Sequence, residues 1–254
     1  MTQDDRIRFI TDLPISDAAP YSEARITKSF NQKSLPVRSN EEQAFFSARS
    51  LVSFTSEVSA ELRDDVLQST LLAQLAANYQ FPENSNIMKW FETFSEVLTK
   101  IGWLIEGSDY QIYRAKESSI EVDTVLLEIL AAAFGSTYIS ILKKSLEAIK
   151  NMGTEDRKIK AFEKNVQSLS KSGFQIALAT DVGGIVSLQI GAFVLNSAHQ
   201  LSRVIFVKTE KDTTTLDYMS KKATLSPSAY SVVRSKVAEQ LQDKLLLNIA
   251  EIKI

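Results

Sequence analysis

The side chains that most often carry out chemistry in proteins are scarce in this sequence of 254 residues. Cysteine is absent, which excludes a disulfide, a thiolate nucleophile and a cysteine-based zinc site. His199 is the single histidine, and no G-x-S-x-G motif presents a serine that it could activate. We therefore assign no catalytic residue, no metal ligand and no cofactor-binding residue, and we expect His199 to lie in a surface turn. These observations favour a non-enzymatic protein over an enzyme.

Three other patterns are explained best as parts of the fold. Asp181–Gly184 holds a Gly-Gly pair, but a phosphate loop would open a helix, whereas this segment joins two strand-like runs, so we expect a hairpin turn. The acidic pairs Glu41-Glu42 and Asp64-Asp65 lie on expected helices without a facing carboxylate pair. Trp90 and Trp103 are expected in the core.

Basic residues outnumber acidic ones between residues 143 and 171. A surface of this kind could touch acidic lipid headgroups or an acidic partner protein, and a solvated helix face explains it equally well. Phe162 is the only aromatic side chain among them and the net charge is -2, so we expect no nucleic-acid partner. The candidate contact residues for membrane lipid or a host or partner protein are Lys143, Lys144, Lys150, Arg157, Lys158, Lys160 and Lys164.

Helical spacing of apolar residues dominates the first two thirds of the chain. Residues 1–39 are rich in proline and polar residues and predict an irregular arm. A Ser39–Glu42 capping box predicts the start of one long helix, or two, over residues 39–79, and a second helix is predicted over 84–105. A strand is predicted near 110–114. One helix is then predicted from the Ser118–Glu121 capping box to about residue 151, and a charged amphipathic helix over 154–170.

The C-terminal third reads differently, as strands followed by a helix. The runs 174–180, 185–195, 203–209 and 215–224 are strand-like, and their short connections permit only antiparallel neighbours. The run 185–195 is apolar on both faces and is expected in the middle of the sheet. Ser226 and Pro227 predict the cap and first residue of a last helix that lies on the sheet.

The most apolar stretch is Val125–Leu142, in which Glu128 is the only charged residue. Apolar groups lie nearly all round such a helix, so it must be buried or must enter another apolar medium. We interpret it as a central helix wrapped by the sheet and other helices, with Gly135 in close contact with another element. Insertion into a bilayer is the alternative, although the stretch is shorter than the ~20 residues that a span needs.

These elements predict an α+β fold with long helices in the N-terminal half, a buried central helix, and a C-terminal antiparallel sheet of four to five strands covered by a C-terminal helix. The fifth strand would be the one near residue 112. No linker separates two cores, so we expect an arm over residues 1–39 and a single domain over residues 40–254.

The run Phe91, Phe94, Leu98 and Ile101-Gly102-Trp103, with the later Ile190–Phe193 strand, looks like bacterial and fungal proteins. The layout of a helical N-terminal half, a very apolar middle helix and a C-terminal antiparallel sheet resembles the Evf-like bacterial virulence factor group. The resemblance is one of layout over about residues 85–250, and it implies an α/β fold and a function directed at a host or a membrane. The group attaches to membranes through an acylated cysteine. That role cannot be carried over, because this chain has no cysteine.

Three hypotheses on function follow. The first is a non-enzymatic interaction protein, virulence- or toxin-associated, that acts at or near membranes. The second is a small-molecule-binding protein or enzyme with a pocket between the sheet and the central helix, and the third is an assembly component of a larger particle. The first residues lack the apolar run of a Sec signal, so we expect a cytoplasmic location in the producing cell, with export by a route that needs no such signal left open.

Overall fold

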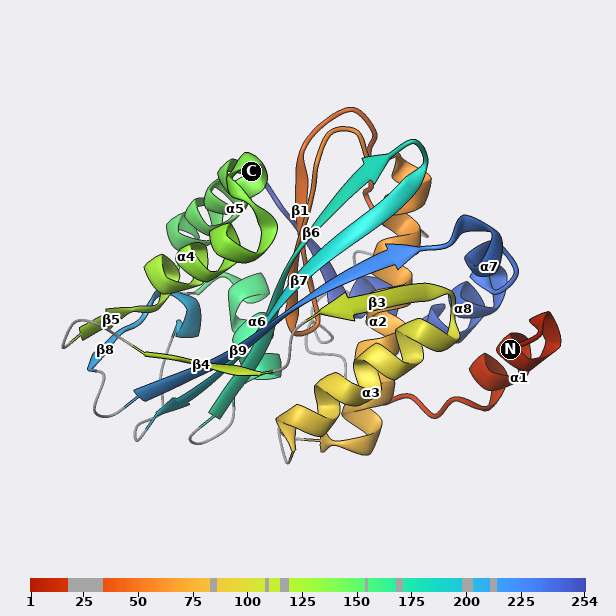
Figure 1. The fold of residues 1–254 in the computed structure, drawn as a ribbon, viewed down its shortest axis with the longest axis horizontal. Helices are drawn as coiled ribbons and strands as arrows, with labels where there is room; N and C mark the ends of the chain where they lie inside the picture. Colours follow the sequence, from red (N-terminus) through yellow and green to blue (C-terminus); the bar gives the residue numbers. More distant parts are fainter. Residues whose placement is uncertain are drawn as a thin grey trace.

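The computed structural model describes residues 1–17, 34–82, 86–107, 110–114, 119–153, 155–167, 171–197, 203–210 and 214–254. A mixed eight-stranded sheet runs through the molecule, with helices on both of its faces (Figure 1). Its strands are β1 (Gln43–Ser47), β2 (Ser50–Phe54), β3 (Trp103–Gly107), β4 (Gln111–Tyr113), β6 (Lys171–Val182), β7 (Ile185–Ser197), β9 (Thr214–Leu225) and β10 (Ile249–Ile252). The order is β10-β1-β2-β6-β7-β9-β3, and β4 also pairs with β9. The α+β class is confirmed, but the sheet is mixed because β2 and β6 are parallel.

The segment expected to be helical over residues 39–79 begins instead with the β1–β2 hairpin, so the first part of that prediction is wrong. Ala48, in the turn, has a positive φ of 48°. Every residue of both strands is buried. Phe45 belongs to the apolar core on one face of the sheet and Phe46 to the core on the other. A strand that is apolar on both faces shows no alternation, which is why its spacing was compatible with a helix.

One helical layer covers the face of the sheet that carries Phe45. It contains α2 (Ala60–Gln80), α3 (Ile87–Lys100) and α8 (Arg234–Leu241). The fully buried Arg63 of α2 donates hydrogen bonds to the carbonyl oxygens of Val58, Thr55 and Glu41 and to the side chain of Gln43. A guanidinium is tolerated in a core only when its donors are satisfied in this way, and here it ties the start of α2 to the hairpin.

The N-terminal arm, expected to be irregular, contains a helix, α1 (Gln3–Asp12). Thr2 and Asp5 form a capping box at its start. Ile10 is fully buried, and its carbonyl oxygen accepts a hydrogen bond from Gln240 of α8. The prediction of an irregular segment is therefore wrong for this part, because local capping and packing on α8 stabilise a short helix.

The second helical layer covers the opposite face of the sheet with α4 (Val122–Phe134), α5 (Ile139–Asn151) and α6 (Arg157–Val166). The prediction of a single buried central helix over 125–142 is wrong. Gly135, with a φ of +83°, ends α4, the turn η2 (Ser136–Tyr138) follows, and α5 packs beside α4. No atom lies within 4 Å of where a Cβ of Gly135 would be, so this glycine serves the turn and marks no close contact.

Small side chains explain why fewer residues of the stretch Val125–Leu142 are buried than its apolar composition predicts. Leu126, Leu130 and Leu142 are fully buried on the sheet side, whereas Ala132 and Ala133 face solvent. Alanine counts as apolar in a sequence pattern, but its small side chain can be exposed to water at little cost. One face of α4 can therefore be exposed to solvent. Among the described residues, no helix is long and apolar enough to cross a bilayer.

Strands β6, β7 and β9 form the predicted antiparallel meander, and β7 lies in its centre. Gly183 and Gly184 form the turn between β6 and β7 with φ values of +66° and +82°, which confirms the predicted hairpin. The Oδ1 atom of Asp181 accepts a hydrogen bond from the backbone of Gly184 and closes the turn. The strand near residue 112 is β4, and it joins this sheet as expected.

The run 203–209 does not enter the meander, so that part of the prediction is wrong. It forms the turn η3 (Val204–Phe206) and β8 (Lys208–Glu210), and β8 pairs with β5 (Ser119–Glu121) in a separate two-stranded sheet. The physical reason is that β7 pairs directly with β9 along nearly its whole length, which leaves no position between them.

The C-terminal helical region begins at the predicted residue but is divided into shorter helices. Ser226 caps α7 (Pro227–Ser231) by accepting a hydrogen bond from the backbone of Ala229. The prediction of one continuous final helix is wrong, because α8 and α9 (Leu245–Asn248) follow as separate helices and β10 then pairs with β1. Helix α8 packs against α2 and α1. The predicted turn residue His199 and the capping residue Ser118 lie outside the described residues.

Gly191 of β7 lies directly beneath Leu130 of α4, and a Cβ there would come within 2.6 Å of the Leu130 Cδ2 atom. We predict that Gly191→Ala lowers the free energy of unfolding by ~1–3 kcal/mol, measured by urea denaturation, because the closely packed Leu130 side chain or its helix must move. Leu130→Ala should then cost less in the Gly191→Ala background than in the wild type. Gly153→Ala, at a site with open space, is the control. Equal stability of Gly191→Ala and wild type would contradict this docking.

Candidate functional site

We call α4, α5, α6 and the η3 turn the outer layer, since they lie together on one side of the sheet (Figure 1). All seven basic residues predicted to contact a partner lie on α5 and α6. The structure therefore brings them onto one layer. Not all seven side chains are equally free to contact a partner.

Helix α6 sorts its residues into two faces. Ile159, Phe162 and Val166 are buried against the sheet. Arg157, Lys160 and Lys164 follow at spacings of three and four residues, which places them on a common face, and all three are exposed. Lys160 forms an ion pair with the exposed Glu155. Arg157 and Lys164 form no ion pair with any residue that the structure describes. We call these three residues the α6 basic stripe.

The lysines of α5, and Lys158 of α6, are mostly engaged within the molecule. Lys144 forms an ion pair with Glu42, and Lys150 with Asp123. The ammonium group of Lys158 donates to the backbone carbonyl of Glu251 in β10. Lys143 is exposed and has no ion-pair partner in the described part of the chain. Three of the predicted contact residues thus help to attach the outer layer to its surroundings.

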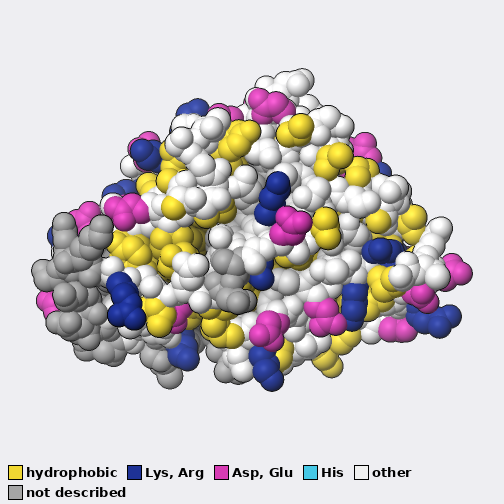
Figure 2. Space-filling model, viewed as in Figure 1, with side chains coloured by type: hydrophobic (Ala, Val, Ile, Leu, Met, Phe, Trp, Pro, Cys, Tyr) yellow, Lys and Arg dark blue, Asp and Glu magenta, His cyan; other side chains and the backbone are white. Residues whose placement is uncertain are grey.

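The surface is mixed in charge on the face that Figure 2 shows, with basic and acidic side chains interspersed. Isolated surface ion pairs such as Lys160–Glu155 contribute only ~0–1 kcal/mol, so they can be exchanged for another partner at little cost.

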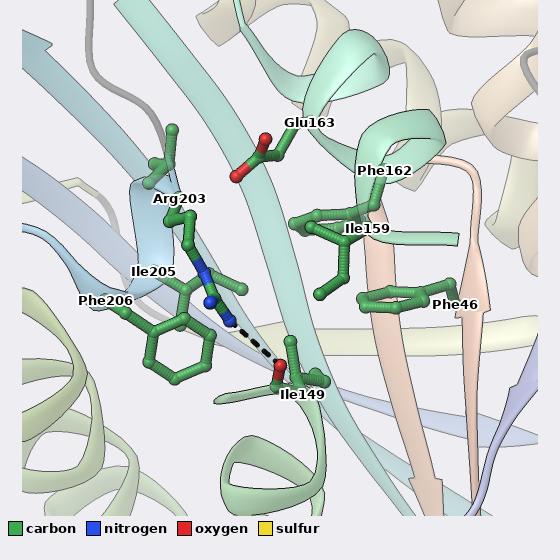
Figure 3. Close-up of a pocket in the computed structure, with 9 residues that line it drawn as sticks. Phe46, Ile149, Ile159, Phe162, Glu163, Arg203, Ile205 and Phe206 are labelled. Atoms are coloured by element: carbon green, nitrogen blue, oxygen red, sulfur yellow. Dashed lines mark hydrogen bonds between the residues drawn. The ribbon is translucent and has the colours of Figure 1, made fainter. Parts of the chain in front are cut away.

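Arg203 connects the η3 turn to the end of α5 (Figure 3). Its Nη2 atom donates to the carbonyl oxygens of Ile149 and Lys150, at 3.0 and 3.1 Å. These carbonyls lie in the last turn of the helix, where a cation is favoured by the helix dipole. Arg203 itself has a left-handed backbone with a φ of 50°, and its guanidinium lies 5.4 Å from the ring centre of Phe206. The side-chain contacts offset the strain of this backbone.

Glu163 of α6 completes this junction. Figure 3 shows its carboxylate above Arg203, and the backbone N–H of Arg203 donates to it. Its Oε1 atom is buried and has no hydrogen-bond partner among the described residues. Burial raises the pKa of Glu163 above its usual range, although the hydrogen bond and the charge of Arg203 act in the opposite direction.

The space between these residues is small. Phe46, Ile159 and Phe162, together with Arg203 and Glu163, line a cavity of about 10 Å³ (Figure 3). That is room for roughly one water molecule. The junction is therefore a clasp that holds α5, α6 and η3 together, and it is too small to bind a ligand as it stands.

The remaining candidates from the sequence have structural roles. Asp65 holds Arg234 of α8 through two hydrogen bonds of 2.8 and 2.7 Å, and Glu42 pairs with Lys144. Trp90 and Trp103 lie in the core, as predicted. Within the described ranges no three His, Cys, Asp or Glu side chains gather as metal ligands would.

Sequence reasoning missed both members of the clasp. Arg203 was expected in a strand and Glu163 on a solvated helix face. The signal that could have found Glu163 is its position on α6 directly after the buried Phe162, since such a position borders the buried face.

No protein-family model matches this sequence, and no curated protein matches it in sequence. Solved structures similar to this chain include the following three. A delta-endotoxin has 10% identity and a TM-score of 0.38 over 64% of this chain and 74% of its own. The activated Cyt2Ba monomer from Bacillus thuringiensis subsp. israelensis has 15% identity and a TM-score of 0.35 over 63% of this chain and 93% of its own.

The third is the Evf virulence factor, with 11% identity and a TM-score of 0.39 over 94% of this chain and 89% of its own. The resemblance of layout expected from the sequence is thus confirmed. The structural neighbours are toxins and a virulence factor. Because all three TM-scores are below 0.5, the likeness is one of layout and supports no conclusion about function.

The raised pKa of Glu163 makes stability depend on pH in a defined direction. A folded state that binds this proton more tightly than the unfolded chain loses stability as pH rises from the unfolded pKa towards the folded one. Glu163→Gln cannot titrate. We predict that the stability of Glu163→Gln relative to wild type increases as pH rises from about 4, where an ordinary glutamate titrates, through the raised pKa of Glu163, measured by urea denaturation. A difference that stays constant, or that moves the other way, would show that Glu163 is not desolvated.

Proposed function

We propose that this protein is a non-enzymatic interaction protein, of the toxin- or virulence-associated kind, that docks on anionic membrane surfaces through its outer layer. The observation that carries the proposal is the α6 basic stripe. Arg157, Lys160 and Lys164 share one exposed face, opposite the buried Ile159 and Phe162.

A stripe of this kind suits a lipid surface because its charges lie along one line and face away from the body. Each Lys or Arg near an anionic membrane contributes ~1 kcal/mol. Three such residues would contribute ~3 kcal/mol, and the exposed Lys143 adds to the same layer. The attraction acts over about one Debye length, ~8 Å at physiological salt, so it falls as salt is added.

Docking of the intact layer is favoured over its insertion as helices. The buried apolar side chains of α4 and α5 include Leu126, Leu130 and Leu142. Fully burying each side chain of this type is worth ~1.5–3 kcal/mol, so detaching the pair into water would cost on the order of 20 kcal/mol. This gross burial term is lost before either helix reaches lipid, whereas docking of the intact layer loses none of it. The clasp of Arg203 and Glu163 keeps the layer attached further.

We predict that the protein floats with phosphatidylglycerol vesicles at low salt and not with phosphatidylcholine vesicles. The variant Arg157→Gln/Lys160→Gln/Lys164→Gln should lose ~100-fold in vesicle affinity, because ~3 kcal/mol of attraction is removed. Flotation at several salt concentrations measures both effects.

The matched control is Arg8→Gln/Lys89→Gln/Lys236→Gln, which makes the same change of charge on α1, α3 and α8, away from the outer layer. It also breaks one ion pair, Lys236–Glu239, as the test variant breaks Lys160–Glu155. If both variants lose affinity equally, net charge alone is responsible and the stripe has no special role. If the wild type does not bind anionic vesicles at all, the proposal is wrong.

A further inference from the structure

Part of the sheet face that carries α4 is left uncovered by the helices that the structure describes. Helix α4 ends at Phe134, beside Lys222 of β9, and a recess of about 250 Å³ lies at its end. Past this level the apolar side chains of Leu104, Val182 and Ile185 are 64%, 74% and 48% exposed. They are three of the eight large apolar side chains that are exposed in the described part of the chain. Water therefore meets apolar surface where the helical cover stops.

The pairing of β3 with β9 shows which side chains share this face. Side chains alternate along a strand, so Leu104 and Glu106 point away from Trp103, which packs in the core on the opposite face. Directly paired residues of neighbouring strands point to the same face. Lys222, paired with Glu106, and Thr224, paired with Leu104, therefore lie on this face too.

The hairpin of β6 and β7 extends the same surface. Val182 and Ile185 are paired with each other, and they lie on the same side of their strands as Leu178 and Phe193. Leu178 and Phe193 belong to the apolar core beneath α4, so this is the α4 face. We call this surface the uncovered sheet end, and it consists of Leu104, Glu106, Val182, Ile185, Lys222 and Thr224.

The uncovered sheet end carries one charge of each sign. Lys222 and Glu106 lie directly opposite each other on neighbouring strands, and both are exposed. Neither forms an ion pair with any residue that the structure describes. An exposed pair is worth only ~0–1 kcal/mol, so these two charges can turn to another partner at little cost. Because the two charges cancel, this surface does not repel a second copy of itself, unlike the α6 basic stripe, which is positive throughout.

We propose that the uncovered sheet end is the contact surface between two copies of this chain, related by a two-fold axis that runs along the strands between β3 and β9. In such an interface residue i meets residue j of the other copy, and j meets i. Lys222 of each copy then meets Glu106 of the other. The four charges form a ring of alternating sign, and the Leu104 side chains of both copies lie beside it, shielded from water.

A second copy fits this surface better than an unrelated partner because the surface supplies its own complement. An unrelated protein would have to provide a carboxylate, an ammonium group and an apolar side chain in matching positions, whereas the two-fold axis places all three. Four strands at ~4.8 Å spacing make the surface only ~15–20 Å wide, smaller than a standard interface, so the dimer is weak and reversible. No residue of the α6 basic stripe takes part, so this contact does not depend on docking to membranes.

Sedimentation velocity of the full chain over ~5–300 µM, without vesicles, measures a weak dimer directly. We expect the average sedimentation coefficient to rise with concentration. Lys222→Glu places four carboxylates in the ring and should weaken dimerisation about tenfold or more, since like charges in contact disfavour association. The swap Lys222→Glu/Glu106→Lys restores alternating signs and should return the dissociation constant to within about threefold of the wild-type value.

Leu104→Asn removes the apolar contact and should also weaken dimerisation about tenfold. The matched control is Ile112→Asn. Ile112 is 63% exposed, as Leu104 is 64%, but it points to the other face of the sheet, because its neighbour Tyr113 packs on the core beneath α4. This control should leave the dissociation constant unchanged. All four variants alter exposed side chains, so each should keep the wild-type melting temperature.

A chain that stays monomeric up to ~300 µM overturns the proposal. A dimer that Lys222→Glu and Leu104→Asn leave unchanged overturns it as well, because that dimer uses another surface. Failure of the charge swap to recover what Lys222→Glu loses would contradict the reciprocal ion pairs. The variant Arg157→Gln/Lys160→Gln/Lys164→Gln should dimerise as the wild type does, so loss of vesicle binding and loss of the dimer are separate outcomes.

Discussion

Apolar side chains point to both sides of the eight-stranded sheet, so each face has to be covered before the strands can be stable in water. On β1 and β2 every position is buried, and on β7 Leu188 and Phe193 belong to different cores. Helices α2, α3 and α8 cover one face, and α4, α5 and α6 cover the other. Glycines permit the close approach that this requires, since Gly191 lies under Leu130 and Gly173 under Ile87.

The same constraint explains how much of the fold the sequence revealed. The β6–β7–β9 meander, helices α3 and α6 and the Ser226-Pro227 start of α7 were predictable because each has a local signal of turn, cap or spacing. The β1–β2 hairpin was not, because strands that are buried on both faces lack alternation. The break at Gly135 was not predicted because the alanines before it are apolar in sequence, as in a buried helix, although Ala132 and Ala133 face solvent.

The candidate site was predictable only where it is local. Arg157, Lys160 and Lys164 lie within two turns of one helix, so their common face follows from spacing alone. The clasp joins Glu163 of α6 to Arg203 beside η3, which are 40 residues apart in the sequence and meet only through the packing of the outer layer. Pairings between distant segments leave no mark in local periodicity. The outer layer thus presents charge outward and is held together by the clasp.

Cohesion of the outer layer with the sheet is the central claim, and native-state amide hydrogen exchange tests it most directly. The buried faces of α4 and α5 share one apolar core with β6 and β7, so exposing them removes much of the burial that stabilises the sheet, and the layer should open only when the molecule unfolds globally. Amides of α4 near Leu126 and Leu130 should therefore exchange with the same opening free energy, and the same denaturant dependence, as those of β7. Exchange of α4 and α5 that is orders of magnitude faster, while β6, β7 and β9 stay protected, would contradict the account.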